Sequence, residues 1–283
     1  MSTDRPPALF VCFDDRDVHL VHTLLRSLAR NWPDHPRVLV NFAGPDPEAL
    51  GEILEHPRVV LLEPLDEQPF QELGTTDFFP ARVYTRLHLW TERFDAWGNI
   101  LYLDADMVVR APLQELMDRD EFFVVADPSE TGRIFRDITD PRAQQLLSED
   151  GLPAFDQPGD MVNSGLFLIP PRYRRREHFD ALLAMGHRYA DFVAYPDQAL
   201  LSMWCFQQGI QPSPRLEYNF QTWMITSPHW MPVSRIKVFH GSGPDKLGSE
   251  AWWHIVRSAS TILRLTSEYR ELWGDTVPRG PRG

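Results

Sequence analysis

Two carboxylates in the middle of the chain are the residues best suited to chemistry. Asp104 and Asp106 stand two residues apart, directly after the apolar run 100–103. Side chains alternate between the two faces of a strand, so both carboxylates point to the same side. They suit a divalent cation such as Mg²⁺ or Mn²⁺, which usually keeps coordination positions that substrate phosphates can fill. The pair predicts a metal site for a nucleotide-sugar pyrophosphate, although two solvated carboxylates in a strand-to-loop turn would have the same spacing.

A second polar segment follows the short apolar strand expected at 236–239. His240 comes directly after it, and the next residues include glycines at 241 and 243 and the cation Lys246. Glycines allow backbone N–H groups to approach an anion closely. A lone histidine here is more often a hydrogen-bonded structural residue than a ligand. Combined with the two carboxylates, however, the imidazole and the glycine loop are what a metal–pyrophosphate site needs.

The elements that must position these side chains alternate between strand and helix. Apolar runs predict strands at 8–13, 37–42, 59–62, 100–103 and 122–126, and helical periodicity predicts helices at 18–29, 47–54 and 81–90. Strands interleaved with helices predict a mainly parallel sheet that binds ligands at the carboxyl ends of its strands. The second half adds a strand at 161–169 and a helix that opens near Tyr195.

Composition limits the class of protein. The chain has 283 residues, a net charge of −12 and 43% hydrophobic residues, which is enough for a sizeable core. The acidity argues against nucleic acid as a partner. Two cysteines, Cys12 and Cys205, fit a reducing compartment. A polar, Pro-rich start and the lack of a long apolar run predict a cytoplasmic protein without a signal peptide or membrane span.

Six motifs, in order, carry a resemblance to glycosyltransferase family 8, the group that contains glycogenin and the lipopolysaccharide galactosyltransferases. Each alone is weak, but together they span about residues 9–246. They are Phe10-Val11-Cys12-Phe13-Asp14-Asp15, Tyr84-Thr85-Arg86-Leu87, Leu101-Tyr102-Leu103-Asp104-Ala105-Asp106, Asn163-Ser164-Gly165, Asp197-Gln198 and the His240-x-x-Gly243-x-x-Lys246 loop.

The resemblance implies a GT-A fold: an α/β protein with a single Rossmann-like, mainly parallel sheet flanked by helices and a smaller acceptor-side region. We expect this domain at 1–250, followed by a helical tail at 251–283 whose last residues are flexible. The implied reaction is a retaining transfer of a hexose from a nucleotide-diphosphate donor, typically UDP-glucose or UDP-galactose. The acceptor would be a hydroxyl of a saccharide, a lipid-linked sugar or a small molecule, and Mn²⁺ or Mg²⁺ would stabilise the leaving diphosphate.

The family pattern also assigns roles to individual residues. Asp104, Asp106 and His240 would ligate the metal, and Gly243 and Lys246 would hold the pyrophosphate. Donor contacts would come from Cys12, Phe13, Asp14, Arg86, Ala105 and Ser164. The transferred sugar would be surrounded by Asp127, Asp160, Asn163, Asp197 and Gln198. The expected catalytic residues are Asp197, Gln198, Asp160 and Lys246.

Some features leave alternatives open. The family often has Pro-Trp after the loop lysine, whereas Leu247-Gly248 follows here, which puts the closure of that loop over the donor in doubt. A metal-dependent phosphohydrolase with Asp104 as nucleophile is a second hypothesis, but such enzymes carry the acidic pair on their first strand. A catalytically inert nucleotide-sugar binder is a third. Trp252 and Trp253 could bring the tail to the inner membrane face, although packing on the domain is the favoured interpretation.

Overall fold

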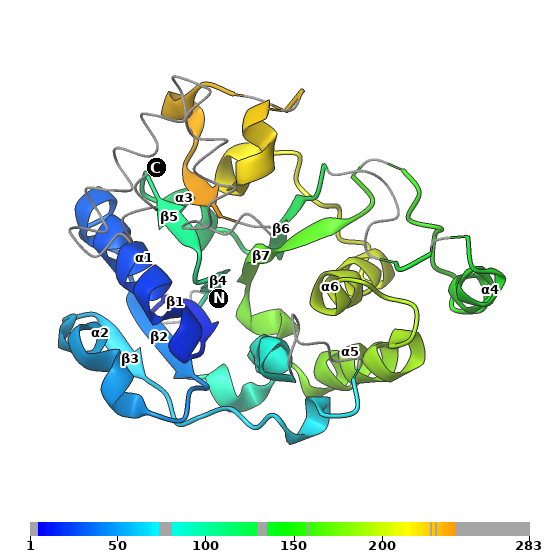
Figure 1. Ribbon diagram of the computed structural model, residues 1–283, viewed down its shortest axis with the longest axis horizontal. Coiled ribbons are helices and arrows are strands. Elements are labelled where there is room, and N and C mark those ends of the chain that lie inside the picture. Colours follow the sequence, from blue (N-terminus) through cyan, green and yellow to red (C-terminus); the bar gives the residue numbers. More distant parts are fainter. Residues whose placement is uncertain are drawn as a thin grey trace, which may run out of the picture.

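The computed structural model describes residues 5–73, 81–128, 135–137, 139–157, 159–226, 228–229 and 231–241. Its centre is a six-stranded sheet in the order β3-β2-β1-β4-β7-β6 (Figure 1). These strands are β1 (Ala8–Phe13), β2 (Arg37–Phe42), β3 (Val59–Leu61), β4 (Ile100–Leu103), β6 (Phe123–Ala126) and β7 (Val162–Ile169). β1 pairs in parallel with β2 and β4, β2 pairs in parallel with β3, and β7 is antiparallel to both of its neighbours. The predicted mainly parallel α/β sheet is confirmed.

A second, three-stranded sheet continues from the first. Its order is β5-β9-β8, and its strands are β5 (Met107–Val109), β8 (Phe220–Gln221) and β9 (Val238–His240). Three residues, 104–106, separate the end of β4 from the start of β5 and form the turn between the two sheets. β9 pairs antiparallel with β5 and places His240 opposite Met107. This register brings the end of β9 next to the turn that carries Asp104 and Asp106.

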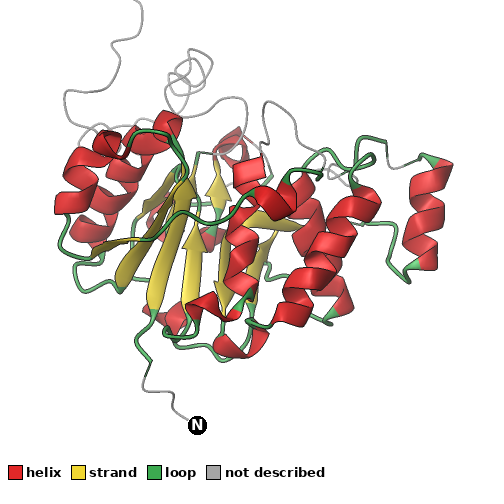
Figure 2. Ribbon diagram, turned by 90° about the horizontal axis from the view of Figure 1, so that it is seen from below, coloured by secondary structure: helices red, strands yellow, loops and turns green. Residues whose placement is uncertain are grey.

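Helices cover both faces of the large sheet (Figure 2). The α-helices are α1 (Val18–Asn31), α2 (Gly51–Glu55), α3 (Gln114–Met117), α4 (Pro141–Glu149), α5 (Arg176–Tyr189) and α6 (Pro196–Gln207). The 3₁₀ segments are η1 (Asp15–Asp17), η2 (Pro47–Leu50), η3 (Gln68–Phe70), η4 (Ala81–Trp90), η5 (Glu92–Phe94), η6 (Pro171–Tyr173), η7 (Leu216–Tyr218), η8 (Thr222–Thr226) and η9 (Val233–Arg235). The helix expected at 81–90 is thus a 3₁₀ helix, in which Thr85 and Arg86 donate side-chain hydrogen bonds to carbonyls three residues earlier.

Alternation along the strands produces two separate cores. Leu9 and Val11 of β1 belong to a core with the apolar side of α1 and with the small sheet. Ala8 and Phe10 of the same strand point the other way, into a core with η4, α5 and α6. Successive strand side chains point to opposite faces, so a fully apolar strand such as β1 is expected only where both faces are covered.

The strand order reverses between β1 and β4. From β1 the chain proceeds outward to β2 and β3, then returns to add β4 on the other side of β1. In open α/β sheets ligands bind outside the carboxyl ends of the strands at such a reversal. Asp14 follows β1 and Asp104 follows β4, so both predicted site segments lie at this reversal.

Candidate active site

The two carboxylates and the imidazole of the predicted metal site come together. Ligand atoms of Asp104, Asp106 and His240 all lie within 4.8 Å of one another. His240 Nε2 is 3.2 Å from Asp106 Oδ1 and 3.6 Å from Asp104 Oδ2. The Gly241 N–H donates to the Asp106 carbonyl at 2.9 Å and holds the two segments together. Two carboxylates and one imidazole are a suitable donor set for Mn²⁺ or Mg²⁺ with open positions.

The second oxygen of Asp104 is occupied by other groups. Its Oδ1 accepts a hydrogen bond from the Tyr102 hydroxyl at 2.5 Å and lies 3.1 Å from Arg86 Nη1. The Arg86 guanidinium sits 4.6 Å above the Tyr102 ring and also lies 3.2 Å from Asp197 Oδ2. With Oδ1 engaged in this way, Asp104 presents Oδ2 toward His240. Tyr102 was not among the predicted site residues.

The charge of Arg86 is stabilised by its surroundings. Burial lowers the pKa of Arg86, but Tyr102 and the carboxylates of Asp104 and Asp197 raise it well above its ordinary value. This buried cation therefore stays charged. It links the metal-type carboxylate to the first turn of α6.

Four of the five polar residues predicted around the sugar form one buried cluster together with Ser164. Asp127 follows β6, Asn163 and Ser164 lie in β7, and Asp197 and Gln198 lie in the first turn of α6. Gln198 Nε2 donates to Asp127 Oδ2 at 2.9 Å, and Ser164 Oγ donates to Asp197 Oδ2 at 2.8 Å. Asn163 Nδ2 lies 3.5 Å from both Asp127 Oδ2 and Gln198 Oε1. Because β7 is antiparallel to β4, its amino-terminal half meets the end of β4 and carries this cluster to Asp104.

His240 is buried between the carboxylates and an amide. Burial lowers the pKa of His240, but Asp106 and Asp104 raise it more, so that it lies above its ordinary value. The negative field that retains a proton on the ring would also attract a metal cation. On its other side, Nδ1 is 2.8 Å from Oδ1 of Asn219, a fully buried residue that sequence reasoning missed.

Gly165 is a position where the backbone comes very close to the site. A Cβ atom here would lie 2.5 Å from His240 Cε1 and 2.9 Å from Asp104 Oδ2. Side chains do not approach one another this closely. The glycine of the 163–165 motif therefore leaves room for two of the three metal-type ligands.

The predicted donor-contact residues Cys12, Phe13 and Asp14, at the end of β1, have different surroundings. Asp14 is buried and lies 2.5 Å from Arg82 Nε and 3.0 Å from Arg16 Nη2. Burial raises the pKa of Asp14, but hydrogen bonds from Arg16 and the charge of Arg82 lower it further, so it stays ionised. The Cys12 thiol lies 3.7 Å from the Tyr102 hydroxyl, and burial raises its pKa. Phe13 packs against Phe42 in the core, with ring centroids 5.5 Å apart.

Four other predicted residues remain. Asp160 accepts a hydrogen bond from the Gln157 backbone N–H at 3.2 Å, in a turn before β7, and no contact described for its side chain joins it to the sugar-side cluster. Ala105 is buried between the two carboxylates. Gly243 and Lys246 lie outside the described residues, as does the tail expected at 251–283.

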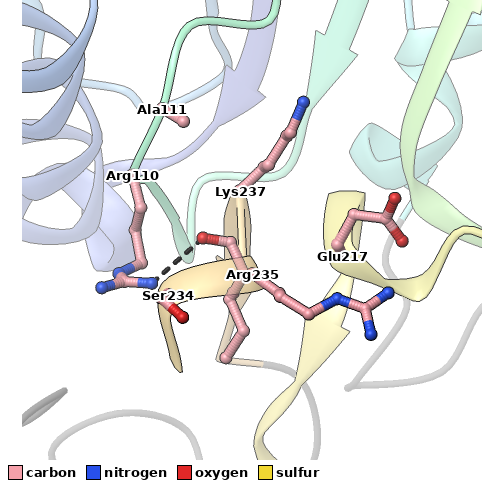
Figure 3. Close-up of a pocket in the computed structure, with 7 residues that line it drawn as sticks. Arg110, Ala111, Glu217, Ser234, Arg235 and Lys237 are labelled. Carbon is pink, nitrogen blue, oxygen red and sulfur yellow. Dashed lines mark hydrogen bonds between the residues drawn. The ribbon is translucent and has the colours of Figure 1, made fainter. Parts of the chain in front are cut away.

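A cavity of about 330 Å³ lies at the opposite end of the small sheet (Figure 3). It is lined by Arg110, Ala111, Glu217, Ser234, Arg235, Ile236 and Lys237. Arg110 Nη1 donates to the Ile236 carbonyl at 3.0 Å across this space. Arg110 follows β5 and Lys237 precedes β9, whereas Asp106 and His240 lie at the other ends of those strands. This cavity is therefore separate from the carboxylate–imidazole site.

The model of the family described as "Glycosyl transferase family 8" matches residues 52–246. The chain belongs to glycosyltransferase family 8. A curated relative, the lipopolysaccharide 1,2-glucosyltransferase of Escherichia coli, is 31% identical over 153 residues, which cover 51% of this chain but only 41% of the relative.

Solved structures share the fold. The galactosyltransferase LgtC, in complex with donor and acceptor sugar analogues, matches with a TM-score of 0.69 at 19% identity, covering 96% of this chain and 98% of its own. The glycosyltransferase GlyE of Streptococcus pneumoniae matches with a TM-score of 0.58 at 18% identity, covering 95% of this chain and 64% of its own. These likenesses confirm the predicted GT-A fold. In the described part of the chain, no helix has the length and apolar character needed to cross a bilayer.

Proposed function

We propose that this protein is a metal-dependent, retaining glycosyltransferase that moves a hexose from a nucleotide-diphosphate sugar to a hydroxyl acceptor. The observation that carries the proposal is the convergence of Asp104, Asp106 and His240 beside the buried polar cluster of Asp197 and Gln198. The first group is suited to a cation and the second to a neutral, hydroxyl-rich ligand. Family membership supports the same assignment.

The donor is proposed to be UDP-linked, with glucose or galactose as the sugar. The E. coli relative is named a glucosyltransferase and LgtC a galactosyltransferase, which supports a hexose without choosing between the two. The acceptor is proposed to be a saccharide, free or lipid-linked, because LgtC was solved with an acceptor sugar analogue. Family membership favours this reaction over the phosphohydrolase hypothesis.

The bound divalent ion, Mn²⁺ or Mg²⁺, would neutralise the charge that develops on the departing diphosphate. Asp104, Asp106 and His240 would hold the ion. Arg86, held between Asp104 and Asp197, orients the two carboxylates and brings a fixed positive charge to the donor side. Lys246 is proposed to add a cation to the pyrophosphate as the glycosidic bond breaks.

The sugar-side groups favour attack from the same face as the leaving group. Asp197 Oδ2 accepts a hydrogen bond from Ser164 and is paired with Arg86, which reduces its strength as a nucleophile. Gln198 has a weakly nucleophilic amide, held by Asp127. We therefore propose that these two residues shape and stabilise the cationic sugar, while the departing phosphate takes the proton of the acceptor hydroxyl. The product then keeps the donor's α configuration.

Calorimetry with UDP and Mn²⁺ tests the metal assignment. Asp106→Ala should abolish the Mn²⁺-dependent part of UDP binding, because it removes one of three ligands. Asp34→Ala, at a carboxylate that is 98% exposed, is the matched control and should bind UDP like the wild type. Unchanged Mn²⁺-dependent affinity in Asp106→Ala would show that the ion is bound elsewhere.

NMR of the product tests the stereochemistry. An α-linked donor should give an α-linked product, and Asp197→Asn should lose most activity without accumulating a glycosyl-enzyme. A β-linked product would overturn the retaining assignment.

A further inference from the structure

A chain of buried amides leads from the backbone of β7 to the ring of His240. Its first bond is unambiguous, because the Gly165 N–H can only donate and lies 3.0 Å from Asn163 Oδ1. The same Oδ1 is 2.7 Å from Asn219 Nδ2. An oxygen that accepts from a backbone N–H must face a second donor here, which is the NH₂ group of Asn219.

The orientation of Asn163 has an independent check on its other side. Its Nδ2 faces the carboxylate Oδ2 of Asp127 at 3.5 Å. An ionised carboxylate only accepts hydrogen bonds, so this atom of Asn163 is the donor. The contacts of Oδ1 and of Nδ2 therefore give the same orientation for the Asn163 amide. The orientation of Asn219 follows from it: Nδ2 toward Asn163 and Oδ1 toward His240.

Asn219 Oδ1 lies 2.8 Å from His240 Nδ1. With an acceptor fixed at that place, Nδ1 must carry a proton, since a bare ring nitrogen would face the oxygen's lone pairs. When a cation lies between Nε2 and the facing oxygens Asp106 Oδ1 and Asp104 Oδ2, the ring keeps this Nδ1 proton and offers the Nε2 lone pair to the cation. An Nε2 lone pair is what a metal ligand requires, and the outer hydrogen bond of a metal-binding histidine normally sets this tautomer.

We propose that Asn219 is a positioning residue of the metal site: by accepting the Nδ1–H bond of His240, it keeps Nε2 free to bind the cation. The inference deepens the proposed function and rests on its metal assignment. Without Asn219, the competing tautomer would place the proton on Nε2, where the Asp106 carboxylate can accept it. Metal binding would then have to move that proton to a buried Nδ1 with no acceptor from this position, which is unfavourable.

Asn219→Leu is the direct test, because leucine has a similar size and branching but no polar atoms. Asn163 Oδ1 keeps the Gly165 N–H in this variant, so the principal loss is the acceptor for His240. The matched control is Thr222→Val, which removes a buried hydroxyl that donates to the His240 carbonyl at 3.2 Å and leaves the ring untouched. A merely structural role would affect both variants alike.

Two readouts separate the outcomes. Long-range ¹H–¹⁵N spectra should show Nδ1–H for His240 in the wild type and Thr222→Val, both in the metal-free protein and with diamagnetic Mg²⁺ bound. In metal-free Asn219→Leu they should show Nε2–H and no Nδ1–H. Mn²⁺ titration followed by EPR of the free ion should give an affinity roughly 10- to 100-fold weaker in Asn219→Leu only.

The proposal is overturned if the wild-type ring carries no proton on Nδ1. It is equally overturned if folded Asn219→Leu binds Mn²⁺ within the error of the wild type. If Asn219→Leu does not fold, the wild-type spectrum alone decides. If the wild type binds no Mn²⁺, the metal assignment fails, whereas the role of Asn219 in fixing the tautomer is still decided by the spectra.

Discussion

Replacement of Gly165 by alanine, with a control at Gly186, should separate an effect on metal affinity from an effect on the free energy of unfolding. The new Cβ would lie 2.5 Å from His240 Cε1, so the ring must retreat by about 0.9 Å to reach the 3.4 Å of ordinary contact. Metal–ligand distances tolerate only about 0.2 Å of change. Because Asp104 Oδ2 is also within 2.9 Å, both ligands are pushed apart by the same methyl group.

We therefore expect Gly165→Ala to weaken Mn²⁺ binding by at least about tenfold, as loss of ligand positioning does. Overpacking of the core should also reduce the free energy of unfolding by about 1–3 kcal/mol. Urea unfolding gives the stability and Mn²⁺ titration by EPR gives the affinity. Both are measured on the metal-free purified protein.

Gly186→Ala is the matched control. Its Cβ would lie 2.7 Å from Leu73 Cδ2, a similarly tight contact, but Leu73 packs against α5 and is not part of the site. It should leave the Mn²⁺ affinity unchanged, because the added methyl group does not touch the metal ligands. Equal Mn²⁺ affinities for Gly165→Ala and the wild type would refute the argument that this glycine makes room for the ligands.

Three further outcomes follow from the contacts. Tyr102→Phe removes a hydroxyl that donates to Asp104 at 2.5 Å, a charged hydrogen bond worth about 1.5–3 kcal/mol. Calorimetry should show Mn²⁺ binding weakened by roughly tenfold or more, and an unchanged affinity would contradict this. Arg86→Met leaves Asp104 and Asp197 without their shared buried cation. It should lower kcat in donor-hydrolysis assays by more than tenfold, whereas a raised KM alone would mean that Arg86 contributes only to donor binding. Burial lowers the pKa values of the stacked His35 and His56 rings in the folded protein. The unfolded chain therefore binds protons first as the pH falls below about 6.5. The free energy of unfolding should fall by about 1.4 kcal/mol for each unit by which a folded pKa lies below its unfolded value. Urea unfolding at neutral and mildly acidic pH checks this, and a His35→Gln, His56→Gln double variant with the wild-type pH slope would refute it.

The parallel half of the fold could be predicted because its patterns are local. The apolar run of β1 and the helical stripe of α1 each require a covered face, and both elements lie where the sequence predicts them. The kind of helix at η4 was not predicted, because hydrogen bonds from Thr85 and Arg86 to nearby carbonyls are not visible as periodicity. The antiparallel direction of β7 depends on pairing with β4, which no local pattern encodes.

The candidate site could be predicted where a residue suited to metal binding lies at the end of a predicted strand. Asp104 directly follows β4, Asp106 directly precedes β5 and His240 ends β9, so their convergence required only that β5 and β9 pair. Asn219 was missed because a lone amide between Tyr218 and Phe220 has the pattern of a buried turn. Its burial directly before β8, the strand that pairs with β9, is visible only in the structure. The predicted sugar-side role of Asp160 stays a prediction, since its described contact is a local turn.

Donor turnover measures the central claim most directly. Wild-type protein is incubated with a panel of nucleotide sugars and a saccharide acceptor, and release of nucleoside diphosphate is followed with Mn²⁺ and after chelation. The account predicts turnover of at least one UDP-hexose that stops on chelation and in Asp106→Ala. Release that persists without metal, or binding of UDP-sugars with no turnover of any donor, would contradict it, and the second result would identify a nucleotide-sugar binder instead.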